Sequence, residues 1–182
     1  MVQKVLPTII FAYSNPSTIM KSSEIKPGTG YGNIFFGMSR EQLKNLLGEP
    51  DEIESTPHDD EEEDVTESWH YDELEISVSF EKTEDWKLCT VAVSTADATL
   101  HGEHPVGMDE ASLSALLAKL DVKNPLKEDW SSADAPDYKA ITAEELEMVF
   151  WLEDGEVMDI QWGPFFIDED TIRWPSNGTA VM

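Results

Sequence analysis

The sequence predicts an α+β fold in which two repeated helix-plus-antiparallel-hairpin units form one continuous sheet with helices on one face. Three observations support it: a recurring glycine-methionine pair, a leucine-rich segment after each pair, and two sets of strand-like segments at matching spacing. Because self-similarity at a fixed spacing indicates a repeated unit, we divide the chain into an N-terminal arm or strand (1–31), repeat units (32–100 and 101–164) and a C-terminal tail (165–182).

The repeat is first visible in its glycines. The segment "GNIFFGM" at 32–38 recurs as "GEHPVGM" at 102–108, which is 70 residues later. Each copy is followed by leucines at positions i, i+3 and i+4, a spacing that places them on one face of a short helix. These leucines are Leu43, Leu46, Leu47, Leu113, Leu116 and Leu117.

The ends of both helices are marked by capping residues. Ser39 with Gln42 three residues later predicts a capping box, and Asp109 is the equivalent N-cap of the second helix. Gly48 and Pro50 predict the end of the first helix. The second helix is expected to continue to about residue 120.

Each unit also contains a predicted hairpin. The strand-like segments at 74–80 and 88–93 match those at 146–152 and 157–162. Because strand side chains alternate between the two faces of a sheet, one apolar set is expected to pack under the helices. That set consists of Ile76, Val78, Phe80, Cys89, Val91, Val93, Met148, Phe150, Leu152, Met158, Ile160 and Trp162. The segments between helix and hairpin are polar and predicted to be mostly loop.

The opposite face of the second hairpin breaks the expected polar pattern. A solvated sheet face should be polar, yet Val149 and Trp151 stand where the first unit has serines. Trp151 either packs beneath the N-terminal arm or the C-terminal tail, or is an exposed anchor for a partner, since aromatic residues rimmed by charge are typical of interface hot spots. The predicted binding residues are Trp151, Val149, Glu147, Asp159 and Gln161.

The charge of the chain limits its partners. Among 182 residues, 38 are Asp or Glu and 12 are Lys or Arg, which gives a formal net charge of −26. Nucleic acids and anionic membranes would be repelled, so we predict neither as a partner. A basic protein partner, a divalent cation or simple solubility are compatible with this charge. With 40% hydrophobic residues, the chain can still form a packed core.

Other features predict little chemistry. Cys89 is the single cysteine, so an intrachain disulfide is impossible and a reducing, cytoplasmic location is favoured, with periplasm or export as the alternative. The apolar segment 5–13 is a poor signal peptide and is interpreted as a strand or ordered arm. His101 and His104 lack the further ligands of a zinc site, and the acidic run 59–64 lacks the spacing of a calcium loop. We predict no catalytic residues, metal or cofactor.

Several of these residues also carry a resemblance to a known family. The Gly-Met-Ser helix opening, the Leu-Gly-Glu-Pro-Asp helix end and the Trp-His-Tyr strand resemble the outer-membrane lipoprotein module SmpA/OmlA and the tandem of two such units in the β-lactamase inhibitor protein fold. The residues involved are Gly37, Met38, Leu43, Leu47, Gly48, Pro50, Asp51, Trp69 and Tyr71, with Gly107 and Met108 in the second copy. The resemblance implies that the open face of a curved sheet binds an enzyme, as in the inhibitor-like members.

The function predicted from the sequence is therefore an acidic protein-binding module that serves as an inhibitor or immunity protein for a basic enzyme or toxin. The alternatives are a cell-envelope assembly factor and a cytoplasmic enzyme with unrecognised chemistry.

Overall fold

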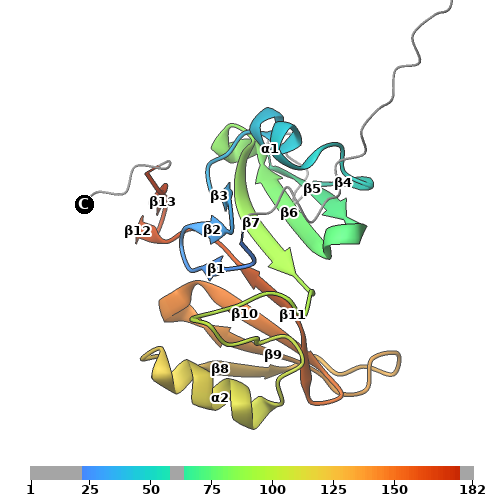
Figure 1. The fold of residues 1–182 in the computed structure, drawn as a ribbon, viewed down its shortest axis with the longest axis vertical. Coiled ribbons are helices and arrows are strands. Elements are labelled where there is room, and N and C mark those ends of the chain that lie inside the picture. The colour runs from blue at the N-terminus through green and yellow to red at the C-terminus, as the bar shows by residue number, and fades with distance from the viewer. Residues whose placement is uncertain (1–21, 58–63, 177–182) are drawn as a thin grey trace, which may run out of the picture.

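The large sheet of this protein has eight antiparallel strands, seen in a computed structural model that describes residues 22–57 and 64–176 (Figure 1). The strands are β4 (Glu52–Pro57), β5 (Val65–Tyr71), β6 (Ile76–Glu81), β7 (Lys87–Val93), β8 (Leu126–Asp129), β9 (Tyr138–Ala143), β10 (Met148–Glu153) and β11 (Glu156–Trp162). Their order in the sheet is β4-β5-β6-β7-β11-β10-β9-β8. Two four-stranded halves therefore meet where β7 pairs with β11.

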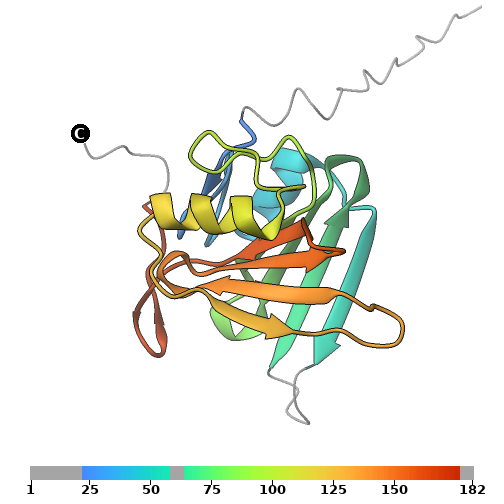
Figure 2. The same cartoon turned by 90° about the horizontal axis from the view of Figure 1, so that it is seen from below.

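The remaining elements lie mainly on one side of this sheet. Helices α1 (Arg40–Leu47) and α2 (Glu110–Lys119) both cover that side (Figure 2), together with a small sheet of β1 (Ile25–Lys26), β2 (Gly30–Tyr31) and β3 (Ile34–Phe35). A separate hairpin of β12 (Phe166–Asp168) and β13 (Thr171–Ile172) follows the last strand of the large sheet. The opposite side of the large sheet carries no helix of the described residues.

The predicted fold class is wrong. The described chain is mostly β, with an eight-stranded sheet and two α-helices, and it is not built from helix-plus-hairpin units. The sequence pattern does not predict β4, β8 and most of β5 and β9, which form the two outer hairpins. Every residue of β4 and β8 is exposed. Edge strands that are exposed on both faces carry no apolar alternation, and alternation was the signal used to predict strands.

The helix ends form as predicted. The Ser39 hydroxyl accepts a hydrogen bond from the Gln42 N–H at 3.2 Å, and the Ser39 N–H donates to the Gln42 side chain at 2.8 Å. The Asp109 carboxylate accepts from the Ser112 N–H at 2.7 Å. Gly48 ends α1, with its N–H donating to the Lys44 carbonyl.

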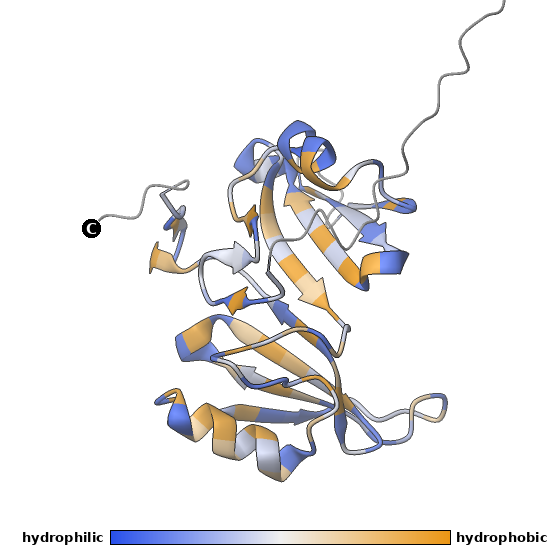
Figure 3. Cartoon of the chain, in the orientation of Figure 1, coloured by the Kyte–Doolittle hydropathy of each residue, from blue (hydrophilic) through white to orange (hydrophobic). Residues whose placement is uncertain are grey.

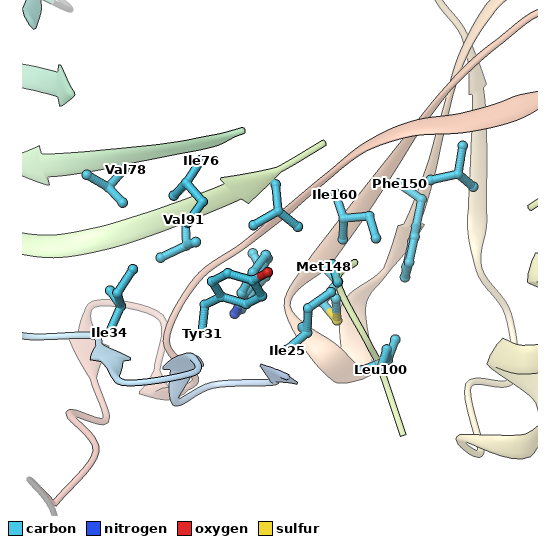
Figure 4. Close-up of a cluster of buried hydrophobic side chains, with 14 of the residues drawn as sticks. Ile25, Tyr31, Ile34, Ile76, Val78, Val91, Leu100, Met148, Phe150 and Ile160 are labelled. Atoms are coloured by element: carbon cyan, nitrogen blue, oxygen red, sulfur yellow. The ribbon is translucent and has the colours of Figure 1, made fainter. Parts of the chain in front are cut away.

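The core lies between the large sheet and the elements that cover it. Figure 3 shows apolar residues concentrated in β6, β7 and β10, and Figure 4 shows side chains from both halves of the sheet in one cluster. Ile25, Tyr31 and Ile34 of the small sheet join that cluster, and the Tyr31 ring meets the Trp162 ring edge-on at 6.0 Å. The small sheet thus closes the core where the two halves meet.

Two bulges alter the predicted faces. The pairing register shifts between Ser79 and Phe80 in the first half, and between Trp151 and Leu152 in the second. Each shift adds one residue to the partner strand, which changes which residues point into the core. Val157 is therefore buried, while Met158, predicted in the core, is 40% exposed. Leu88, which was not in the predicted set, is buried in the same way.

Candidate functional site: the open face of the sheet

The uncovered side of the large sheet, here called the open face, is polar and acidic over most of its area. No helix or strand of the described residues lies across it (Figure 2). Strand register assigns to it Glu52, Glu54, Thr56, Thr66, Ser68, His70, Ser77, Ser79, Glu81, Lys87, Thr90, Ala92, Leu126, Glu128, Tyr138, Ala140, Thr142, Val149, Trp151, Glu153, Glu156, Asp159 and Gln161. This set includes seven carboxylates and one lysine, Lys87, which lies opposite Glu81.

An aromatic pad, formed by Trp130, Tyr138 and Trp151, interrupts the polar surface of the second half. The Trp151 and Tyr138 rings are stacked with centroids 5.3 Å apart and an interplanar angle of 11°. Trp130 meets Trp151 edge-on at 6.0 Å and is 55% exposed. The pad forms because small Ala140 lies directly opposite Trp151, which leaves room for Tyr138, two residues before Ala140 in β9.

The structure answers the question of what Trp151 packs against. Among the described residues its ring neighbours come from the β8–β9 hairpin, and not from the tail, while the arm proposed at 5–13 lies outside the described residues. Trp151 is half-buried within an aromatic group that keeps an exposed edge at Trp130. Trp130 and Tyr138 were not among the predicted binding residues. Their one signal was an aromatic residue on each side of the turn-rich segment "SSADAPD".

Four of the five predicted binding residues form a compact block. On β10 and β11, Val149 pairs with Gln161 and Trp151 pairs with Asp159. Glu147 lies outside this block, because it occupies the left-handed turn before β10 with φ of 52°. At the usual rise per residue it lies about 13 Å along the chain from Trp151. Glu147, predicted near the aromatic anchor, thus lies just before the strand that carries Trp151, and its part in binding stays a prediction.

The Asp159 carboxylate is half-buried and has no partner. Burial raises its pKa from 3.8 to about 6, and no hydrogen bond or ion pair to it occurs among the described residues. The helix side of the same half differs, since Lys127 pairs with Glu110 and Lys139 pairs with Asp137, both at 2.7 Å. Asp159 is thus a carboxylate whose desolvation is not offset by a cation of this chain.

A junction pocket adjoins Asp159 where the two halves of the sheet meet. Its volume is about 230 Å³. It is lined by His70, Tyr71, Asp72, Glu75, Ile76, Ser77, Ala92, Ser94 and Asp159, which come from both halves. Because Asp159 is paired with Trp151 across the strands, the pocket and the aromatic pad are neighbours on the open face.

The first half of the open face consists of satisfied polar pairs. The Ser68 and Ser79 hydroxyls lie 2.9 Å apart, and His70 Nδ1 lies 2.8 Å from the Ser77 hydroxyl. Glu54 lies 3.8 Å from the other ring nitrogen of His70. The order Ser77, His70, Glu54 resembles the catalytic triad of an esterase. An esterase also needs free backbone N–H groups aimed at an oxyanion, whereas β5 and β6 are inner strands whose backbones are paired on both sides. We therefore interpret this row as cross-strand hydrogen bonding.

Metal, thiol and membrane features add no further site. Within 22–57 and 64–176, no three His, Cys, Asp or Glu side chains are grouped as metal ligands, and of the acidic run, 59–63 falls outside the described residues. Burial raises the pKa of Cys89 to about 12, which leaves its thiol protonated and unreactive. In the described part of the chain, no helix has the length and apolar character needed to cross a bilayer.

Replacing Asp159 with asparagine is expected to stabilise the free protein by about 1 kcal/mol at pH 8 and to have little effect at pH 4. The raised pKa means that the folded state disfavours the charged carboxylate, so the contribution of Asp159 to stability falls as pH rises from about 4 to about 6, whereas asparagine does not titrate. The magnitude allows for partial solvent screening. Urea denaturation of both proteins at the two pH values measures the difference.

Glu153→Gln is the matched control, because it removes an exposed carboxylate from the neighbouring strand of the same face. It should leave the difference between the two pH values unchanged. Equal unfolding free energies for Asp159→Asn and wild type at pH 8 would show that the Asp159 carboxylate is fully solvated.

Comparisons with known proteins give little on function. No protein-family model matches the sequence, and a comparison with curated proteins found no match. Among solved structures, the chain is similar to a 1.5 Å crystal structure of an extracellular protein containing an SCP domain from Bacillus anthracis strain Ames, with 13% identity and a TM-score of 0.41. The alignment covers 90% of this chain and 50% of that one, so this chain spans about half its length. The SmpA/OmlA resemblance is untested by these comparisons and stays a prediction.

Proposed function

We propose that this protein is an acidic protein-binding module that holds a basic protein against its open face, as an inhibitor or immunity protein for a basic enzyme or toxin. The observation that carries the proposal is the aromatic pad on a sheet face that bears seven carboxylates against one lysine. Such a face suits a partner of opposite charge and disfavours a polyanion.

The two features of the open face contribute differently to binding. The chain has 38 acidic and 12 basic residues. This excess of negative charge attracts a basic protein at long range and raises the association rate. Aromatic side chains that are already packed against each other lose little conformational freedom on binding, so they provide contact area that slows dissociation. Charge therefore selects the partner, and the pad retains it.

Trp151→Ala is expected to weaken binding of the basic partner about 30-fold, which corresponds to about 2 kcal/mol, mainly through faster dissociation. The partner is first captured from the source cell at low salt, released at high salt and identified by mass spectrometry. Surface plasmon resonance with the purified partner then compares the wild type and the variant. Circular dichroism checks that the variant remains folded.

Phe166→Ala is the matched control, since Phe166 is an exposed aromatic residue in the β12–β13 hairpin, outside the large sheet. It should bind as the wild type does. A basic partner that binds Trp151→Ala as tightly as the wild type would place the interface elsewhere and contradict the proposal.

A further inference from the structure

The junction pocket has the size and charge of a receptor for one basic side chain. Its volume of about 230 Å³ is below the roughly 300 to 1,000 Å³ that is typical of small-molecule sites. Its lining residues include three acidic ones, Asp72, Glu75 and Asp159, and neither lysine nor arginine. A cationic side chain of a bound protein would therefore enter a space whose charge is complementary to its own.

Asp159 differs from the other carboxylates of this acidic chain. It is half-buried, it lacks a partner among the described residues, and it stands directly opposite Trp151. Burial raises its pKa, so the charged form is destabilised until a cation approaches. The surface carboxylates Glu110 and Asp137 already have lysine partners. Binding of a cation at Asp159 would thus recover an interaction that the free protein lacks.

Arginine fits this position better than lysine. A guanidinium group is more weakly hydrated than an ammonium group, so moving it beside a half-buried carboxylate costs less. The guanidinium group is also planar, so its face can stack on an aromatic ring while its N–H groups donate hydrogen bonds to a carboxylate. The aromatic pad lies beside the pocket, because Trp151 on β10 is paired with Asp159 on β11. There it can contact apolar residues that flank the arginine in the partner's chain.

We propose that the open face docks an arginine-bearing segment of the basic partner, with the arginine in the junction pocket beside Asp159 and its apolar neighbours on the aromatic pad. This rests on the proposed function, because the arginine belongs to the protein partner described above. The occupant is a side chain from another protein, and charge complementarity between pocket and guanidinium is the reason for that choice.

The test uses three acetylated and amidated tripeptides as probes: Leu-Arg-Leu, Leu-Lys-Leu and the neutral counterpart with citrulline in the centre. Amide chemical shifts of the labelled full-length protein are followed by NMR at pH 7.5 during each titration. The arginine probe should shift the amides of Ala92, Ser94 and Asp159, with a dissociation constant on the order of millimolar. The citrulline probe should bind at least tenfold more weakly, and the lysine probe should lie between the two.

Asp159→Asn should weaken binding of the arginine probe at least tenfold. Glu52→Gln is the matched control, because it makes the same change of charge on the outermost strand of the open face. It should leave the affinity within about twofold of the wild type. Equal binding of the arginine and citrulline probes, equal binding of the arginine and lysine probes, or unchanged affinity in Asp159→Asn would each overturn the assignment.

The same variants separate this inference from the proposed function. If the captured basic partner depends on Trp151 but binds Asp159→Asn as tightly as the wild type, the arginine assignment fails and the protein-binding function stands. If no basic partner depends on Trp151 while the arginine probe still requires Asp159, the pocket is correct and the proposed function fails.

Discussion

Phe150→Ala is expected to lower the free energy of unfolding by about 3 to 5 kcal/mol. Phe150 is fully buried on β10, where it pairs with Ile141 on one side and Ile160 on the other, and Figure 4 shows it within the central cluster. Its removal would lose buried apolar area and leave a cavity that neighbouring strands cannot close. Urea denaturation followed by circular dichroism measures the change.

Glu153→Ala serves as the control, since Glu153 lies on the same strand but is exposed. It should change the free energy of unfolding by less than about 0.5 kcal/mol. A loss near zero for Phe150→Ala would mean that the core does not lie on the side of the sheet described above. Eight residues of the helix and strand faces predicted to be apolar are buried there: Leu43, Leu47, Phe80, Val91, Leu113, Leu117, Phe150 and Ile160.

Gly30→Ala is expected to cost about 3 kcal/mol or more, through backbone conflict in the small sheet. Gly30 has φ of +145°, and an added Cβ would lie 2.0 Å from the Ile34 carbonyl oxygen. Either Gly30 or the paired strand β3 would have to move, which would displace Tyr31 from its contact with Trp162. Backbone strain and overpacking each cost about 1 to 3 kcal/mol. Thermal and chemical unfolding of the purified variant measure the loss.

Gly107→Ala separates the two contributions. Gly107 also has positive φ, at +84°, but an added Cβ there would have no heavy atom within 4 Å. This variant should cost only about 1 kcal/mol, from backbone conformation alone. If Gly30→Ala lowered the free energy of unfolding no more than Gly107→Ala does, the close approach of β2 and β3 would not contribute to the loss.

The unpaired Asp159 carboxylate connects stability with the proposed binding. A chain selected only for stability would place an uncharged residue at a half-buried position of this kind, because the carboxylate is desolvated there with no offsetting cation. A site that binds a partner's cation carries this desolvation cost while the partner is absent. The predicted gain in stability for Asp159→Asn and the predicted loss of arginine binding are therefore two measurements of one feature.

The sequence by itself determined the elements that bury one face. The helical spacing of the leucines and the caps at Ser39 and Asp109 predicted α1 and α2, and apolar alternation predicted the inner hairpins β6–β7 and β10–β11. Periodicity is strong in such segments because each must separate its core side chains from its solvent side chains. The break in alternation at Val149 and Trp151 also located a surface that β10 and β11 do present on the open face.

Tertiary structure alone decided the rest. Edge strands β4 and β8 are exposed on both faces, so no periodic signal in their residues predicted the outer hairpins or the eight-stranded sheet. The bulge opposite Leu152 moved Met158 out of the core, which depends on pairing between strands. The aromatic pad requires the register of β9 against β10. The junction pocket requires the pairing of β7 with β11, which brings residues of the first half beside Asp159, far away in the chain. The local sequence pattern indicates which side chains are buried, whereas the pairing of strands determines which side chains from different strands become neighbours.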